Sequence, residues 1–431
     1  MPDENHDWLN QVNPDFDRFL ALGAKKDRSA LRMFKNYSQG VLTARDAWCY
    51  SASKSLVERN INSMIEFYNS ERVRYNKASD HEKLDVAKFI DSDSTRISWT
   101  RALKKDLGKN KTLAFSEGEA LISTYRPFSK QWMYYGRRLN EMVYQMPQIF
   151  PNAKAENRVI CVTGIGATAG FSALIVHAVP NFHTLDSGQC FPLKLYKKIE
   201  TSRDDDLFEG SGNPQYRVQD GISDQALTHF QTAYPGETIS KEDLFYYLYG
   251  ILHSEDYRTK YKNNLMKQLP RLPVVTDVED FRAFLAAGYA LAELHLGYET
   301  VDPWPVTIND GKGLPDGVEP ERLYRVEKMK FGGGHGAKKD RTKIVYNPYI
   351  TISDIPLEAY NYVVNGKPAI QWVIERQNVK TDKASRLVND TNHYAIETMG
   401  NPAYPMELLR RIIRVSMETL EIVRDLPPLQ A

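Results

Sequence analysis

The chain has 431 residues, of which 42% are hydrophobic, so it can bury the cores of two or three domains. Its 56 Lys and Arg residues balance 55 Asp and Glu residues, and the net charge of +1 excludes binding to polyanions through overall charge. A surface for nucleic acid would therefore need a local cluster of Lys and Arg.

The three cysteines, Cys49, Cys161 and Cys190, lie far apart and form no Cys-x-x-Cys pair. This spacing argues against a zinc knuckle, a redox pair or a disulfide framework. The N-terminal residues lack the apolar run of a signal peptide, and no run of about 18 apolar residues predicts a transmembrane helix. We therefore expect a cytoplasmic protein without a membrane partner.

The first part of the chain predicts helices. Apolar residues recur at helical spacing from Leu56 to Tyr68, and Ser55 with Glu58 forms a capping-box start. Residues 73–90 carry few apolar side chains and predict a solvent-facing helix followed by a linker. We expect residues 1–115 to form a mostly helical connector.

The middle of the chain predicts strands first and helices later. Short β-prone runs at 131–135, 158–163 and 171–176 are separated by Gly, Pro and Asn. Between residues 243 and 295 the apolar residues return to helical spacing.

The last part predicts a hairpin and then helices. Runs at 322–331 and 343–352 flank the glycine-rich segment 332–336, which is typical of a hairpin with a flexible tip. Helices are predicted at 369–376, 384–398 and 406–423. Because strands and helices come in separate blocks, the class is α+β, and residues 116–431 form a mixed domain with antiparallel strands and a helical C-terminal part.

Two motifs suggest cofactor or catalytic chemistry, and each has a simpler explanation. Residues 164–170 are glycine-rich like a nucleotide-binding loop, but 171–176 predicts a strand where a phosphate-binding helix would be needed. Asn347-Pro348-Tyr349 is one proline short of the Asn-Pro-Pro-Tyr motif of adenine-N6 methyltransferases, and an edge-strand proline is the favoured interpretation.

The histidines and carboxylates of the sequence show no spacing typical of a metal or catalytic site. His177 and His183 are separated by Pro180, and His295 lies on an apolar helical stripe that is typical of a core histidine. Pro315-Asp316 precedes Glu327 and Lys328 at the wrong distance for a metal-dependent nuclease. We predict no catalytic residue, no metal and no cofactor in this chain.

Three stretches concentrate cations and amides that could contact DNA. Residues 125–138 interleave aromatic residues with cations, and the tip of the predicted hairpin is basic. Residues 372–386 end one predicted helix and begin another, so a helix N-terminus beside cations could hold a phosphate, and amides there could read adenine. A solvated turn or an ordinary helix connection explains each stretch equally well. The candidate DNA-binding residues are Arg126, Lys130, Gln131, Arg137, Arg138, Lys338, Lys339, Arg341, Lys343, Arg376, Gln377, Asn378, Lys380, Lys383 and Arg386.

Several ordered segments of the chain together form a recognisable pattern. They are residues 125–131, 140–147, 189–193, 249–254, 257–258, 355–360, 363–368, 372–386 and 398–402. These segments resemble one family, the C-terminal specificity region of Type ISP restriction-modification enzymes, and the similarity extends from His6 to Leu429, nearly the whole chain.

The resemblance implies a non-catalytic module that recognises double-stranded DNA. In that family one polypeptide carries a nuclease, a helicase-like ATPase, a coupler, an adenine-N6 methyltransferase and then a target-recognition domain, and this chain is similar to the last part. S-adenosylmethionine, ATP and Mg²⁺ are expected only in the upstream domains, which would act in cis or in trans. The chain departs from the whole enzyme because the Walker A, Asn-Pro-Pro-Tyr and nuclease motifs are missing from its sequence. The alternatives are a fragment of an S-adenosylmethionine-dependent methyltransferase, or an assembly subunit of a phage-defence system.

Overall fold

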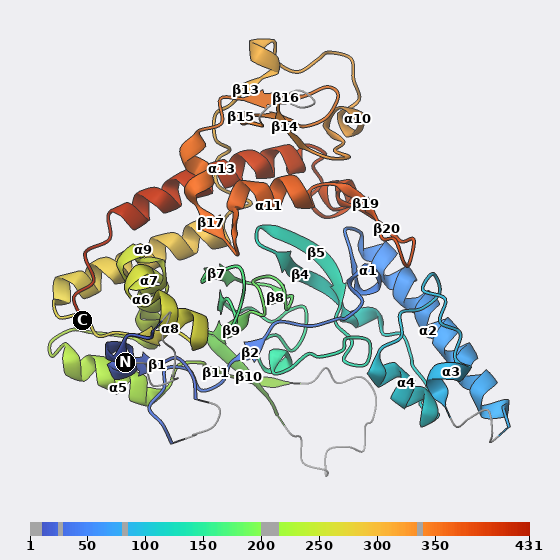
Figure 1. Cartoon of the computed structure of the whole chain (residues 1–431), viewed down its shortest axis with the longest axis horizontal. Coiled ribbons are helices and arrows are strands. Elements are labelled where there is room, and N and C mark those ends of the chain that lie inside the picture. Colours follow the sequence, from blue (N-terminus) through green and yellow to red (C-terminus); the bar gives the residue numbers. More distant parts are fainter. Residues whose placement is uncertain (1–10, 25–28, 80–84, 200–214, 334–338) are drawn as a thin grey trace.

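The computed structural model describes residues 11–24, 29–79, 85–199, 215–333 and 339–431. Helices and strands form separate blocks along the chain, and the strands make small, mostly antiparallel sheets (Figure 1). The predicted α+β class is confirmed. No described helix is both long enough and apolar enough to cross a membrane.

One four-stranded sheet combines an N-terminal strand with the middle of the chain. Its order is β3 (Tyr50–Ser51), β5 (Ser129–Tyr134), β4 (Ala120–Arg126) and β8 (Val179–Pro180), with only β4 and β8 parallel. The helices beside it are α1 (Asp46–Cys49), α2 (Lys54–Lys77), α3 (Val86–Phe89) and α4 (Arg101–Gly108).

The predicted helix near residue 56 is confirmed as α2, but its start and end differ from the prediction. Ser53, not Ser55, is the N-cap, because the Ser53 side chain accepts a hydrogen bond from Leu56 N. The helix continues to Lys77 because Tyr75 still adds a buried side chain to the apolar stripe.

A second four-stranded sheet separates two hydrophobic clusters formed by the described residues. Its order is β2 (Ser38–Gln39), β9 (Gln189–Pro192), β6 (Val159–Val162) and β7 (Ala173–Val176). Along β6, Val159 and Cys161 belong to one cluster and Ile160 and Val162 to the other, as the two-residue period of a strand requires. Since β6 and β7 are antiparallel neighbours, residues 164–170 join strand to strand and form no nucleotide-binding loop.

The predicted helical region at 243–295 is confirmed and packs against this second sheet. It contains α6 (Lys241–His253), α7 (Glu255–Lys260), α8 (Lys262–Lys267) and α9 (Val278–Leu296), preceded by α5 (Asp224–Ala233). Helices α6 and α9 cross at Gly250 and Gly288, where a Cβ on Gly288 would lie 1.8 Å from the Tyr246 carbonyl oxygen. The ribbon β10 (Lys194–Lys198) and β11 (Tyr216–Asp220) and the pair β1 (Leu20–Ala21) and β12 (Arg271–Leu272) complete this part.

The C-terminal part places a third four-stranded sheet above two packed helices (Figure 1). The helices are α11 (Ala369–Arg376) and α13 (Tyr404–Arg424), close to the predicted ranges. The sheet order is β13 (Thr307–Ile308), β16 (Thr351–Ser353), β15 (Asp340–Val345) and β14 (Lys330–Gly332), and the pair β17 (Val363–Val364) and β18 (Lys367–Pro368) precedes α11.

The predicted hairpin forms between β14 and β15, but its flanks differ from the prediction. Pro320 begins a short helix, α10 (Pro320–Tyr324), so only the end of 322–331 is a strand. Residues 343–352 are two strands, because the Asn347 side chain accepts from the backbone N–H of Tyr349 and of Ile350, both at 2.8 Å. Asn347-Pro348-Tyr349 is therefore a turn, and the interpretation of Pro348 as an edge-strand proline was wrong.

The helix predicted at 384–398 is wrong in its first half. Residues 377–390 form a hairpin of β19 (Val379–Thr381) and β20 (Val388–Asp390), followed by α12 (Thr391–His393) and a π-helical turn at Tyr394–Thr398. Asp382 closes the hairpin turn by accepting from Ser385 N and Ala384 N, and Arg386 has a left-handed φ of 61°. No helix therefore begins within residues 377–390, and the phosphate-binding site predicted at a helix N-terminus is absent there.

Residues on both sides of position 115 share sheets and core. Ser38–Gln39 pairs with β9 and Tyr50–Ser51 pairs with β5, and one hydrophobic cluster includes side chains from Val41 to Val415. The division into a connector of 1–115 and a recognition domain of 116–431 stays a prediction.

Candidate nucleic-acid interface

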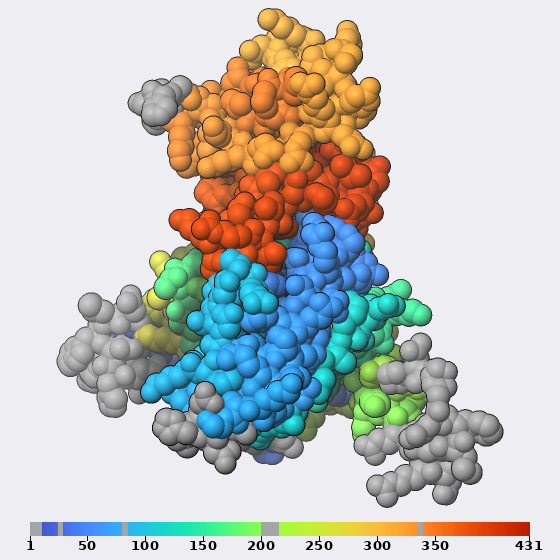
Figure 2. All heavy atoms as spheres, turned by 90° about the vertical axis from the view of Figure 1, so that its right-hand side faces the viewer, coloured from blue at the N-terminus to red at the C-terminus, as the bar shows by residue number. Residues whose placement is uncertain are grey.

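A half-enclosed cavity of about 500 Å³ lies between the N-terminal and C-terminal parts of the chain. The walls come from α1, β3 and α2, from the β4–β5 hairpin, from the end of α11 and from the β19–β20 hairpin. Figure 2 shows this side of the molecule, where the blue residues of α2 meet the red residues of the C-terminal part. Two of the stretches that the sequence singled out, 125–138 and 372–386, therefore come together here.

The carboxylates in the cavity wall are all bound by other groups of the protein. Asp46 accepts from Arg126 Nη2 at 3.3 Å and from the Thr43 hydroxyl. Glu375 accepts from Lys367 Nζ at 2.6 Å and from Gln371 Nε2 at 2.8 Å, while Asp382 accepts from the hairpin turn.

The cations in the same wall form no ion pairs with the described residues. Within the described ranges, Lys328, Arg376 and Lys380 make no ion pair. The Nε of Arg376 is buried without a hydrogen-bond partner, and burial, followed by repulsion from Arg126, lowers the pKa of Arg376. The wall therefore holds three cations without an ion pair beside three carboxylates that other groups of the protein bind, in a chain whose net charge is only +1.

Amides and aromatic rings form the rest of the polar lining. Gln131 is 3% exposed on β5, and its side-chain amide has no hydrogen-bond partner among the described residues. The rings of Tyr50 and Tyr125 lie with centroids 4.7 Å apart at an interplanar angle of 46°. Such groups can contact the edges and faces of nucleobases.

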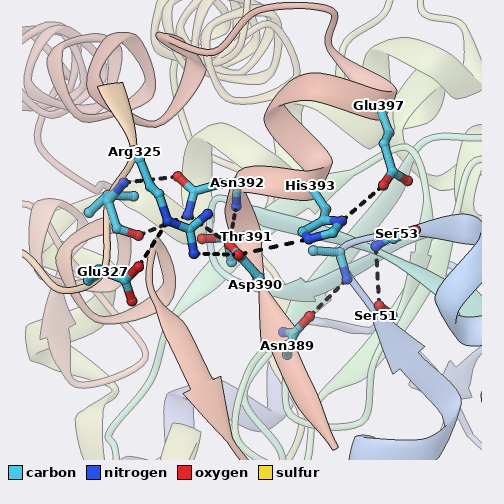
Figure 3. A network of polar contacts seen from close by, with 12 residues as sticks. Ser51, Ser53, Arg325, Glu327, Asn389, Asp390, Thr391, Asn392, His393 and Glu397 are labelled. Atoms are coloured by element: carbon cyan, nitrogen blue, oxygen red, sulfur yellow. Dashed lines mark hydrogen bonds and ion pairs between the residues drawn. The ribbon is translucent and has the colours of Figure 1, made fainter. Parts of the chain in front are cut away.

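A buried polar network fixes the β19–β20 hairpin against both neighbouring parts (Figure 3). Asn389 Oδ1 accepts from Ala52 N at 2.8 Å, which ties β20 to the start of α2. Asp390 Oδ2 accepts from Arg325 Nη2 at 2.8 Å, and Asn392 exchanges two hydrogen bonds of 2.9 Å with the backbone of Val326. The hairpin wall of the cavity is therefore held in place from two sides.

Four of the candidate residues line this cavity: Gln131, Arg376, Asn378 and Lys380. The neighbouring Gln377 is buried, and its Oε1 has no partner. Lys383 and Arg386 are exposed on the same hairpin.

Arg126 and Lys130 use their charges inside the protein. Arg126 donates to Asp46, Asn181 and its neighbour's carbonyl oxygen, and its guanidinium lies 3.9 Å from the Tyr125 ring centroid. Lys130 Nζ lies 2.5 Å from Glu299 Oε2, and both side chains are nearly buried.

The remaining candidates lie on two other surfaces. Lys339 borders a cavity of about 420 Å³ that shares Met329, Ile374 and Glu375 with the first, so this surface adjoins the main cavity. Arg341 is exposed nearby, Lys343 pairs with Asp310, and Lys338 lies outside the described residues. Arg137 and Arg138 are exposed beside α4, where Arg138 Nη1 donates to Thr112 O at 3.1 Å.

Sequence reasoning missed functional candidates in the part expected to be a connector. Asp46, Tyr50 and Asn60 line the main cavity, although no local pattern marks them. A second group had a visible signal, since five Lys and Arg residues fall within 101–111, three of them on α4. Lys328 also lines the main cavity, and its position beside Glu327 gave no hint of this.

The surroundings of His295 test the prediction that it is a core histidine. His295 is buried, with Tyr249 Oη 2.7 Å from its Nδ1 and Thr419 Oγ1 2.8 Å from its Nε2, and burial lowers its pKa to about 3. This environment confirms the prediction of a satisfied core histidine. Among the residues that the structure describes, no group of three or more His, Cys, Asp or Glu side chains is placed to hold a metal ion.

The sequence matches the family described as the Type ISP C-terminal specificity domain over residues 32–408. The chain belongs to this family, and the resemblance found in the sequence is confirmed.

Three solved structures are similar over the full length of the chain. They are a nuclease-deletion mutant of the Type ISP restriction-modification enzyme LlaGI in complex with a DNA substrate mimic (33% identity, TM-score 0.82), the ATP-dependent Type ISP restriction-modification enzyme LlaBIII bound to DNA (32%, 0.83) and a DrdV–DNA complex (30%, 0.81). Each match covers 100% of this chain but only 36%, 25% and 40% of those chains. Among curated proteins, none matches this chain.

Proposed function

We propose that this chain recognises a specific double-stranded DNA sequence for a Type ISP restriction-modification enzyme and catalyses no reaction itself. The observation that carries the proposal is the full-length similarity to Type ISP enzymes whose structures contain DNA. The unpaired cations around the main cavity support it, because positive groups without protein partners are suited to phosphates.

The β19–β20 hairpin is the centre of the proposed interface. Lys380, Lys383 and Arg386 would contact the DNA backbone, with Lys339 and Arg341 of the β14–β15 hairpin extending the same surface. The amides that line the cavity would contact bases. Arg126 and Lys130 would shape the surface without touching DNA, because their cationic groups already have protein partners.

Methylation, ATP hydrolysis and cleavage would belong to other domains. The relatives are much longer than this chain, and we place an adenine-N6 methyltransferase and a nuclease-helicase there, in cis or in trans, with S-adenosylmethionine, ATP and Mg²⁺. Residues 1–115 would connect those domains to the recognition part. Calorimetry with S-adenosylmethionine separates this proposal from a methyltransferase fragment, which would bind the cofactor without added domains.

The experiment is selection of bound duplexes from a random pool, followed by affinity measurements as a function of salt. Lys380→Ala with Lys383→Ala should weaken binding and flatten the slope of log K against log salt by about 2, since each lost phosphate contact removes about 0.9 from that slope. The matched control is Lys260→Ala with Lys262→Ala on α7 and α8, which are exposed and distant from the hairpin (Figure 1). An unselective pool, or equal effects of the two double variants, would contradict the proposal.

A further inference from the structure

We propose that the main cavity binds a single nucleotide, with its phosphate on Arg376 and Lys380 and its base beside Gln131. This inference deepens the proposed function, because the nucleotide would be one that leaves the stack of the bound duplex. Every group named for this site lies within this chain.

The size of the cavity excludes a duplex and suits a small ligand. Its volume of about 500 Å³ falls inside the range of about 300–1,000 Å³ that is typical of small-molecule sites. A B-DNA major groove is already about 12 Å wide, so a duplex can only cover the opening. One nucleotide turned out of the stack is the part of DNA that can enter.

The cations define the phosphate end of the site. Arg376 lines the cavity and makes no ion pair with any residue the structure describes. Repulsion from Arg126 contributes to its lowered pKa, so an anion beside the Arg376 guanidinium would offset that repulsion. Lys380 and Lys328 line the same cavity and make no ion pair with any residue the structure describes. The wall carboxylates Asp46 and Glu375 pair with Arg126 and Lys367, which do not line the cavity, so they form no ion pair with the cations of the wall.

The amides and rings define the base end. Gln131 is nearly buried and unpartnered, so both its donor and its acceptor remain open to the cavity. Asn389 is oriented by the hydrogen bond from Ala52 N to its Oδ1, which leaves its side-chain amino group without a partner within the described ranges. The rings of Tyr50 and Tyr125 add flat apolar surface. A simple anion would use the cations alone, whereas a nucleotide uses all three kinds of group.

The test replaces each position of a selected duplex, one at a time, with the fluorescent base 2-aminopurine, which brightens when it is unstacked. One position should brighten several-fold on binding to the full chain. Gln131→Leu and Lys380→Ala should remove that signal, while Lys383→Ala, on the same hairpin but outside the cavity wall, should keep it. Thermal melting checks each variant, and Lys380→Ala decides alone if Gln131→Leu fails to fold.

A parallel arm measures binding of the four free deoxynucleoside monophosphates by calorimetry. Binding that weakens about tenfold in Gln131→Leu, without a bright position in the duplex, supports the cavity as a nucleotide site and assigns it to free nucleotides. Nucleotide binding without duplex binding would overturn the proposed function and the duplex as the source of the nucleotide, and would leave the cavity as a nucleotide site. A bound duplex with no bright position, together with no binding of any monophosphate, would overturn the inference alone.

Discussion

Asn392 offers the sharpest test of how the β19–β20 hairpin is held (Figure 3). The side chain is 5% exposed, and its Oδ1 accepts from Val326 N while its Nδ2 donates to Val326 O, both at 2.9 Å. Nδ2 also donates to Asp390 Oδ1 at 2.7 Å. Because Val326 is fully buried, water cannot replace these bonds.

Replacing Asn392 by Ala removes the partners of one buried N–H and one buried C=O group. Each orphaned group costs about 1–3 kcal/mol, so the free energy of unfolding should fall by about 2–6 kcal/mol. Urea denaturation at constant slope m measures this loss as a shift of the midpoint.

The neighbouring residue provides the matched control. The His393 side chain is 42% exposed and contacts Glu397 at 2.9 Å and Asp390 Oδ2 at 3.8 Å, so His393→Ala should cost at most about 1 kcal/mol. Equal urea midpoints for Asn392→Ala and His393→Ala would refute the reasoning. The buried hydrogen bonds of Asn392 would then contribute no more stability than the exposed contacts of His393. Asn392→Ala should also weaken DNA binding, since the hairpin would lose its anchor to the segment before β14.

Two further predictions concern groups buried away from the cavity. Lys130→Met should lower the free energy of unfolding by about 3–5 kcal/mol, because it leaves Glu299 buried without its cation. Adding Glu299→Gln should restore much of this loss. Weaker DNA binding at unchanged stability would instead show that Lys130 contacts DNA. The second concerns pH: the folded pKa of His295, about 3, lies below the ordinary 6.5, so the unfolded chain binds the proton first and stability falls as pH drops below about 6.5. His295→Gln should reduce the slope of stability between pH 7 and 5 by up to about 1.4 kcal/mol per pH unit, and an unchanged slope in urea midpoints would contradict the assignment.

Elements that depend on local pattern were predictable from the sequence. The apolar stripe of α2, the antiparallel pair β6 and β7 and the bounds of α11 follow from side-chain periodicity and from turn residues, which act over a few positions. The segment 384–398 was mispredicted because its conformation depends on distant partners. Asp390 and Asn392 bond to Arg325 and Val326, which no local window contains.

The sequence by itself determined the family, the α+β class and most of the helices, because these follow from ordered motifs and short-range periodicity. The tertiary structure decided which cations are free. Lys130 and Lys380 were both candidate DNA-binding residues from the sequence. Packing pairs Lys130 with Glu299, 169 positions away, and leaves Lys380 in the wall of a cavity. That cavity joins Gln131 to Arg376 across the chain, and the physical reason is that long-range packing, not sequence spacing, sets which charges lose their partners.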